Sequence, residues 1–146
     1  MDKNGTSKGS SYKFTQLFGY KGPNEKILEE DIISAMKFDK SGKFLALGDK
    51  AGRIIIFECP DSSKKKDEYD YFSAFQSHTR EFDPLRSMDI EEEIKEINWL
   101  NPQGNYMKMA TTNDRNIKLW KIYEKAEKRV VKSAGKDLNM PKLQSI

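Results

Sequence analysis

Apolar and polar residues alternate over residues 110–121, and this pattern predicts a β-hairpin. We expect one strand over residues 106–112 and the next over residues 117–121, because the asparagine and aspartate residues between them suit a tight turn. The second strand directs Ile117 and Leu119 to one face and the ring of Trp120 to the other. Both faces are suited to burial, so this strand belongs inside a stack of sheets.

Similar alternation and one β-branched run predict further strands, separated by turns rich in glycine, asparagine or aspartate. They cover residues 12–18, 32–38, 44–47, 53–57, 69–75 and 94–99. We expect the turns at residues 39–42, 48–52 and 101–104. The chain is therefore predicted to be all-β.

The pattern recurs once along the chain. Residues 94–99 match residues 33–38, Met109 matches Leu45, and residues 117–120 match residues 54–57. The terminal aromatics, Phe57 and Trp120, lie 63 residues apart, whereas a propeller repeat has about 40–45 residues. The excess lies in residues 58–68 and 76–92, which predicts two blades with a long connection. Because such repeats bury their faces only against neighbours, we expect a piece of a larger propeller or a chain that needs a partner.

This pattern divides the chain into five parts. They are a disordered start (1–11), the first strand and most of blade one (12–57), a loop with the last strand of blade one and an inter-blade excursion (58–93), blade two (94–122), and a polar insertion with the beginning of another strand, cut short (123–146).

Composition limits the classes of function. Charged residues make up 34% of the 146 residues, but the formal net charge is only +3. The basic residues are spread out, apart from residues 64–66 and the tail, so we expect no nucleic-acid partner. The single cysteine, Cys59, excludes an intramolecular disulfide and a Cys-rich zinc site. The chain has no signal-peptide pattern and no apolar run near about 18 residues. We therefore expect a cytosolic protein, with the nucleus as a second location, and no membrane partner.

Several features invite a chemical interpretation, and each has a plainer one. His78, the sole histidine, lacks partners for a metal site or a catalytic triad, so we expect a loop or structural role. The carboxylate run at residues 91–93 invites the interpretation of a cation site or an acid–base pair, but a solvated loop or binding rim fits better. The turn at residues 48–52 lacks the helix that would hold a phosphate. Trp99 and Trp120 are expected to pack within the blades. We expect no cofactor and no metal.

Some of these motifs resemble one family. The aspartate-containing turn before Ile-Lys-Leu-Trp resembles the end of a WD repeat, and Phe-Gln-Ser-His at residues 75–78 followed by Glu-Phe-Asp at 81–83 is more specific. With residues 48–53, 89–92 and 112–121, these stretches resemble the B-class (55-kilodalton) regulatory subunits of protein phosphatase 2A. The resemblance covers residues 12–121 well and the tail weakly. It implies a seven-bladed WD-repeat propeller, of which this chain supplies about two blades.

The resemblance also implies a role. Such a subunit is not catalytic: it docks on the phosphatase scaffold beside the catalytic subunit and presents phosphoprotein substrates through an acidic face. Glu29, Lys50 and Glu91 match its substrate-facing loops, and Glu93 stands where we expect a lysine.

Docking and structural residues follow from the same resemblance. Phe82, Leu85 and Arg86 match an excursion associated with docking, although Pro84 replaces the usual aromatic residue. A second docking element, the long hairpin after blade two, has a divergent counterpart here from about residue 123. The residues assigned to turns and blade packing are Asp49, Asp114, Phe57, Trp99 and Trp120.

Two other classes of function stay open. The first is a generic WD-repeat scaffold without a phosphatase partner. The second is an enzyme, which the sequence disfavours because it offers no convergent nucleophile and base.

Overall fold

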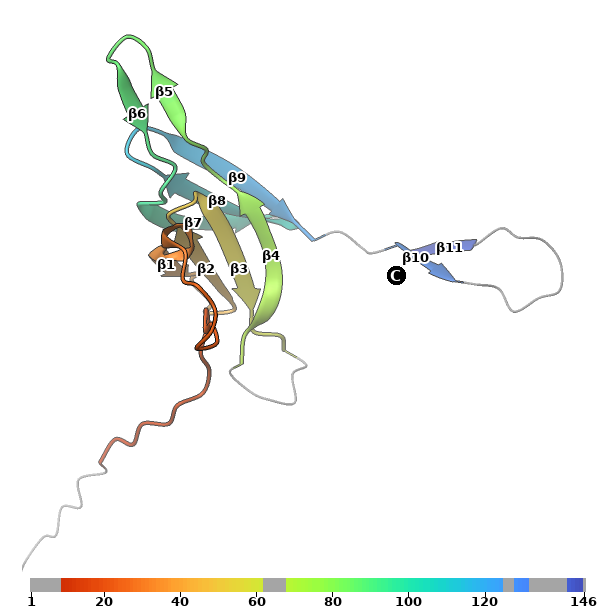
Figure 1. The fold of residues 1–146 in the computed structure, drawn as a ribbon. Coiled ribbons are helices and arrows are strands. Elements are labelled where there is room, and N and C mark those ends of the chain that lie inside the picture. The colour runs from red at the N-terminus through yellow and green to blue at the C-terminus, as the bar shows by residue number, and fades with distance from the viewer. Residues whose placement is uncertain (1–8, 62–67, 125–127, 132–141, 146) are drawn as a thin grey trace, which may run out of the picture.

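The chain folds into antiparallel β-sheets, as seen in a computed structural model that describes residues 9–61, 68–124, 128–131 and 142–145 (Figure 1). A 3₁₀ turn, η1 (Glu29–Asp31), precedes the strands. No helix within these ranges is long and apolar enough to cross a bilayer. The strands are β1 (Ile33–Phe38), β2 (Phe44–Asp49), β3 (Arg53–Glu58), β4 (Asp70–Gln76), β5 (Glu81–Asp83), β6 (Met88–Ile90), β7 (Glu96–Gln103), β8 (Tyr106–Thr112), β9 (Ile117–Tyr123), β10 (Lys128–Val131) and β11 (Lys142–Ser145). The predicted all-β class is confirmed.

The first sheet has the order β1-β2-β3-β4, and every pairing in it is antiparallel. Its interior strand β3 carries the isoleucine run at residues 54–56, which suits a strand with a neighbour on each side. Gly52 ends the turn between β2 and β3 with a φ of +78°, a conformation that glycine adopts without strain. The turn predicted at residues 48–52 is confirmed over residues 50–52, since β2 continues to Asp49.

The second sheet has the order β7-β8-β9 and repeats the register of the first. In both sheets an apolar residue of the second strand pairs with an aromatic residue on each side. The aligned triplets are Phe38–Leu45–Phe57 in the first sheet and Trp99–Met109–Trp120 in the second. The predicted internal repeat is therefore confirmed at the level of strand pairing.

The hydrophobic core lies between the two sheets. Its buried members are Ala46, Ile54 and Ile56 from the first sheet, Ile97 and Met109 from the second, and Ile94 from the segment before β7. Each buried isoleucine contributes about 1.5–3 kcal/mol relative to an exposed one. Between β1 and β7, Trp99 Nε1 donates a hydrogen bond of 3.0 Å to the Lys37 carbonyl. The β2 backbone at Gly48 lies so close to the Ile94 side chain that a Cβ on Gly48 would be 2.6 Å from Ile94 Cγ2.

A buried polar network also joins the two sheets. Trp120 Nε1 lies 3.1 Å from Ser77 Oγ and 3.0 Å from Thr111 Oγ1. Ser77 Oγ lies 2.7 Å from Thr111 Oγ1 and 3.1 Å from His78 Nδ1. Since Ser77, His78 and Thr111 are all buried, water does not compete for these hydrogen bonds. The structural role predicted for His78 is confirmed.

The strand predicted over residues 12–18 is not formed. Tyr12 and Phe14 are exposed, so the alternation in this segment does not correspond to a buried face. The segment is held by side chains: Gln16 exchanges two hydrogen bonds with the Tyr69 backbone, and the Phe18 ring lies 4.5 Å from that of Phe57. Among the described residues, β1 and β4 form the edges of the first sheet, and residues 12–18 pair with neither of them.

The turn predicted at residues 101–104 is displaced toward the C-terminus. β7 continues to Gln103, and the turn falls on Gly104, with a φ of +66°, and Asn105. A register shift between Leu100 and Gln103 accommodates Pro102, which has no N–H to donate. The edge position of β7 in its sheet makes this irregularity tolerable.

The outer face of the second sheet is not buried, contrary to the expectation for β9. Ile117 and Leu119 are each 72% exposed, whereas Trp120 on the opposite face packs against the core. The sheet buries the face that meets the first sheet. Within the described residues, no sheet covers the other face.

Two hairpins lie outside the sheets (Figure 1). The β5–β6 hairpin follows the first sheet in the sequence and precedes the second, and the β10–β11 hairpin follows the second sheet. Strands of three residues, such as β5 and β6, are too short to show alternation, and the sequence did not predict them. Residues 1–8 of the predicted disordered start and the lysines at residues 64–66 lie outside the described residues.

The close approach at Gly48 leads to a first prediction. Gly48→Ala is expected to lower the free energy of unfolding by about 1–3 kcal/mol, the usual cost of overpacking a filled core, because the new methyl group meets Ile94. Thermal denaturation followed by circular dichroism measures the change. Gly22→Ala is the matched control, since a Cβ there meets nothing within 4 Å. Equal melting temperatures for the two variants would contradict the packing of the sheets.

The buried histidine leads to a second prediction. Burial, and then the charge of Lys118, lower the pKa of His78 below its usual 6.5, while the Asn116 backbone and Glu81 act in the opposite direction. The unfolded chain therefore binds this proton more readily, and the stability of the fold decreases as the pH falls through 6.5 toward the folded-state pKa. Melting temperatures between about pH 8 and pH 5 measure this slope.

Variants of the network test the assignment of this slope. His78→Gln is expected to flatten it, whereas Ser77→Ala, which keeps the imidazole, retains it. An undiminished slope in His78→Gln would assign the acid sensitivity to other groups.

Candidate functional site

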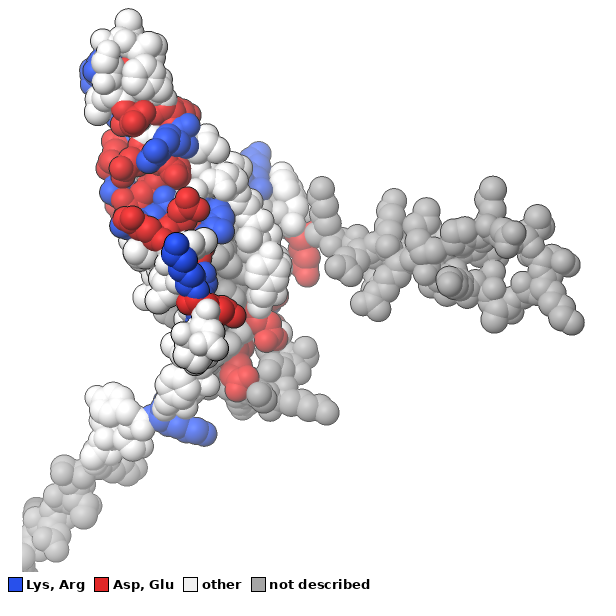
Figure 2. All heavy atoms as spheres, viewed as in Figure 1, with Lys and Arg blue, Asp and Glu red and all other residues white. Residues whose placement is uncertain are grey.

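An acidic hollow of about 500 Å³ opens where η1 and the β2–β3 turn meet residues 91–93. Its lining consists of Glu29, Glu30, Lys50, Arg80, Glu91, Glu92 and Glu93. Figure 2 shows acidic side chains gathered on this part of the surface, next to the projecting β5–β6 hairpin. Glu29, Lys50, Glu91 and Glu93, the residues that the sequence pointed to for recognition, all lie in this lining. They come from three separate segments that the fold brings together.

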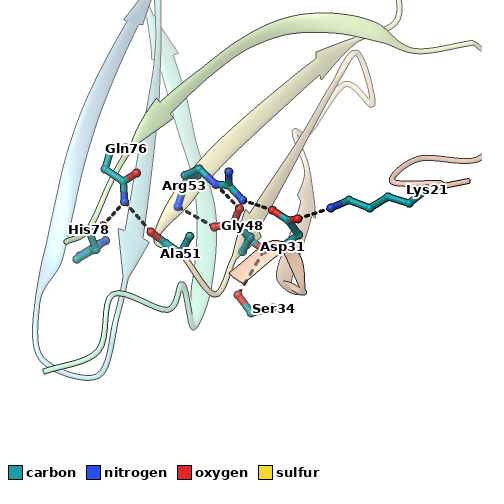
Figure 3. Close-up of polar contacts among 9 residues, drawn as sticks. Lys21, Asp31, Ser34, Gly48, Ala51, Arg53, Gln76 and His78 are labelled. Atoms are coloured by element: carbon teal, nitrogen blue, oxygen red, sulfur yellow. Dashed lines mark hydrogen bonds and ion pairs between the residues drawn. The ribbon is translucent and has the colours of Figure 1, made fainter. Parts of the chain in front are cut away.

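The β2–β3 turn carries Lys50 into the hollow and is fixed by backbone contacts. The Gly52 carbonyl accepts hydrogen bonds from the amides of Ser77 and His78, at 2.9 and 3.1 Å. Gln76 Nε2 donates 2.6 Å hydrogen bonds to the carbonyls of Ala51 and His78 (Figure 3). A Cβ at Gly52 would lie 2.2 Å from the His78 carbonyl oxygen and 2.8 Å from that of Glu92. A glycine is therefore required where the three segments meet.

A chain of ion pairs holds η1, and with it Glu29 and Glu30, at the rim. Buried Asp49 accepts from the Arg53 amide at 2.9 Å and from Arg53 Nε at 2.6 Å. Arg53 also donates to Asp31 at 2.8 Å, and Lys21 donates to the other Asp31 oxygen at 2.5 Å (Figure 3). The hydrogen bonds from Lys21 and then Arg53 hold the pKa of Asp31 below 3.8. Asp49, predicted as a turn residue, thus anchors a network that extends to η1.

Opposite charges pair inside and beside the hollow. Lys50 Nζ lies 3.0 Å from Glu29 Oε1, Lys95 Nζ lies 2.7 Å from Glu93 Oε2, and Arg80 Nε lies 3.5 Å from Glu92 Oε2. The hydrogen bond to Glu29, and then the charges of Glu29, Glu93 and Glu91, raise the pKa of Lys50 above 10.5. Lys50 is therefore a cation at neutral pH. With five glutamates against Lys50 and Arg80 in the lining, the hollow keeps an excess of negative charge.

The predicted docking residues lie on the β5–β6 hairpin. Phe82 is 61% exposed, Leu85 is 96% exposed, and Arg86 is also exposed. Asp83 Oδ1 accepts hydrogen bonds from the amides of Leu85 and Arg86, and Asp83 Oδ2 pairs with Arg115 at 2.7 Å. The hairpin therefore presents its apolar side chains to solvent on a turn that is tied to the second sheet.

The residues assigned to turns and packing lie in different environments. Phe57, Trp99 and Trp120 are half-buried, and Trp99 and Trp120 pack against the core. Asp114 is exposed, and the turn bonds of the β8–β9 hairpin are made by Asn113, whose Oδ1 accepts from the amides of Arg115 and Asn116. Asn113 Nδ2 donates to the Glu91 carbonyl at 3.0 Å, so this turn also supports the hollow.

Sequence reasoning missed several members of the site. Arg80 and Glu30 line the hollow, and Asn113 supports it. Glu30 adjoins Glu29 in the sequence, which was the available signal for it. Arg80 gave no signal of its own, since a lone arginine in a loop has no pattern.

Within the described part of the chain, the arrangement offers binding and no evident catalytic set. The buried pair of Ser77 Oγ and His78 Nδ1 has the spacing of a nucleophile and base, but its hydroxyl is bonded to Trp120 and Thr111 inside the core. Among the described residues, no group of three or more His, Cys, Asp or Glu side chains is placed to hold a metal ion. The hollow itself is a negatively charged surface, lined by five glutamates, one lysine and one arginine.

Comparison with known proteins gives several similar sequences, whereas no family model matches the chain. The chain is 49% identical over 127 residues to a B-type regulatory subunit of protein phosphatase PP2A from Candida tropicalis, covering 86% of this chain and 25% of that protein. It is 50% identical over 122 residues to a protein of the same name in Schizosaccharomyces pombe, covering 84% of this chain and 26% of the other. The beta isoform of the 55 kDa B-type regulatory subunit of serine/threonine protein phosphatase 2A in Arabidopsis thaliana is 41% identical over 134 residues, 82% of this chain and 27% of its own length.

These relatives agree with the resemblance drawn from the motifs. The chain spans about a quarter of the length of the curated relatives it matches. Over the stretch that it covers, the chain is homologous to the B-class (55 kDa) regulatory subunits of protein phosphatase 2A.

Proposed function

We propose that this chain is a non-catalytic regulatory subunit that associates with the scaffold and catalytic subunits of protein phosphatase 2A and recruits phosphoprotein substrates to them. Identities of 41–50% to proteins named as such regulatory subunits support the proposal. The observation that carries it is the acidic hollow, in which Glu29, Lys50, Glu91 and Glu93 lie together. On this proposal the chain acts in the cytosol and the nucleus and needs no cofactor.

Recruitment would rest on charge. A basic segment of a substrate would meet the excess of glutamate in the hollow, and its lysine or arginine side chains would pair with carboxylates such as Glu91, which is exposed. Lys50 and Lys95 would neutralise part of the negative charge, and the remaining carboxylates would accept hydrogen bonds from the substrate at defined positions. Such complementarity raises the association rate and selects partners more than it raises affinity.

Docking would rest on the β5–β6 hairpin. Its exposed Phe82 and Leu85 form an apolar surface that a partner subunit would remove from water. The hairpin projects from beside the acidic surface (Figure 2), so a substrate held in the hollow would lie on the same side of the molecule as subunits bound to the hairpin.

Charge variants of the hollow form the third prediction. Glu91→Lys is expected to weaken binding of a lysine- and arginine-rich peptide about threefold to tenfold at low salt, and Lys50→Glu is expected to strengthen it. Both effects should diminish at high salt, because exposed charges are screened. Fluorescence anisotropy with a labelled peptide measures the affinities.

A charge change elsewhere is the control for this series. Glu25→Lys alters the net charge by the same amount as Glu91→Lys, but residue 25 does not line the hollow. Equal weakening by Glu25→Lys and Glu91→Lys would assign the effect to net charge and refute a recognition site.

Variants of the hairpin form the fourth prediction. Leu85→Ala is expected to weaken binding of the 146-residue chain to purified scaffold and catalytic subunits about tenfold, the effect of truncating a side chain at an interface centre. Biolayer interferometry measures the affinity, and Tyr20→Ala, at another exposed site, is the control. If the unaltered chain binds neither the scaffold subunit nor the catalytic subunit, a generic WD-repeat scaffold without a phosphatase partner is favoured instead.

A further inference from the structure

The ion pairs in and beside the hollow differ in how closely they are made. The pairs that Lys50 and Lys95 form with glutamates are hydrogen bonds of 3.0 and 2.7 Å. Arg80 Nε lies 3.5 Å from Glu92 Oε2, and among the described residues no donor makes a hydrogen bond to this oxygen. The pair of Arg80 and Glu92 is therefore held by charge alone.

Glu92 presents this oxygen to the hollow from a fixed backbone. Its main chain passes so close to the β2–β3 turn that a Cβ on Gly52 would be 2.8 Å from the Glu92 carbonyl oxygen. Two residues later, Ile94 is completely buried, and its amide donates to the Asp49 carbonyl at 3.1 Å. The Glu92 side chain is 24% exposed, and its Oε2 atom is buried. A buried acceptor without a hydrogen bond costs free energy, so a donor that reached Glu92 would remove this cost.

Arg80 approaches Glu92 from the segment that joins β4 to β5. Its side chain is 64% exposed, so solvent is available to it when it leaves the carboxylate. A guanidinium has five N–H donors and can bind a carboxylate through two parallel hydrogen bonds, but the approach of Nε at 3.5 Å uses none of them. An arginine of a basic ligand carries the same group, and it would therefore compete with Arg80 for Glu92.

We propose that Arg80 is an internal competitor of the substrate: it neutralises Glu92 in the free protein, and an arginine of the bound basic segment takes its place. This inference rests on the proposed recruiting function and identifies the carboxylate that sets its specificity. Arginine would be preferred to lysine, because its planar donors match a carboxylate. A basic segment without a suitably placed arginine would leave the internal pair intact and would bind more weakly.

Affinity for a labelled arginine-rich peptide, measured by fluorescence anisotropy, tests the proposal. Arg80→Ala is expected to strengthen binding about twofold to fivefold, and Glu92→Gln to weaken it by a similar factor, the range for an ion pair at a surface. Physiological ionic strength is used because it screens charges more than about 8 Å apart. Lys26→Ala is the matched control, since it also removes one positive charge but lies outside the lining of the hollow.

The double variant separates competition from net charge. In a chain that carries Glu92→Gln, Arg80→Ala is expected to change the affinity much less than it does in the parent chain, because the pair it would break is already absent. Arg80→Lys keeps a competing cation and is expected to bind as the parent chain does. Equal strengthening by Arg80→Ala in both backgrounds, or weaker binding of the single Arg80→Ala variant, would overturn the proposal. Melting temperatures followed by circular dichroism check the fold, and the exposed Arg80 variants remain a test by themselves if Glu92→Gln unfolds.

The outcomes for the inference and for the recruiting function differ. If Glu91→Lys weakens peptide binding while Arg80→Ala and Glu92→Gln bind as the parent chain does, the recruiting function stands and the competition by Arg80 is refuted. A parent chain that does not bind the peptide would overturn both.

Discussion

The structure depends on the burial of one apolar sheet face against another. Ile54 and Ile56 lose all contact with water only because Ile97 and Met109 lie opposite them. A strand such as β3 has large apolar side chains on both faces, so a single sheet cannot satisfy it, and the fold must stack sheets. The same requirement explains why the second sheet resembles the first in register: a repeated unit presents a repeated surface to its neighbour.

Close packing of the sheets also builds the hollow at their end. Gly48 lets Ile94 lie against β2, and Gly52 lets the backbones of His78 and Glu92 approach the β2–β3 turn. The acidic segment at residues 91–93 leads directly into Ile94, so burial of this isoleucine holds the glutamates beside Lys50. The arrangement of charge at the surface is thus a consequence of two glycines and one core residue beneath it.

The sequence was sufficient for the sheets and insufficient for the parts between them. The alternation of apolar and polar residues and the internal repeat predicted the strands of both sheets, because both features reflect which side chains are buried. Residues 12–18 alternate as well, but alternation alone does not show whether a segment pairs with a sheet edge or is held by side-chain contacts, as this one is. The recognition residues were assigned through family resemblance alone, because spacing in the chain cannot bring residue 29 next to residue 91. Asn113 makes the turn hydrogen bonds that were expected of Asp114. This depends on which side chain faces the Glu91 carbonyl, and local composition does not specify it.

The fold separates two kinds of surface by geometry. Side chains of a strand stand perpendicular to its sheet, so the faces collect the apolar residues that the stacking of sheets requires. Turns lie at the ends of the strands, where chain direction reverses and polar side chains such as those of Asp49, Lys50 and Asn113 satisfy the backbone or meet solvent. The stacking of sheets and the charged surface at the ends of the strands therefore use different residues. A chain built in this way can vary its turn charges, as Glu93 and Lys95 illustrate by pairing with each other, without disturbing the contacts by which its sheets stack.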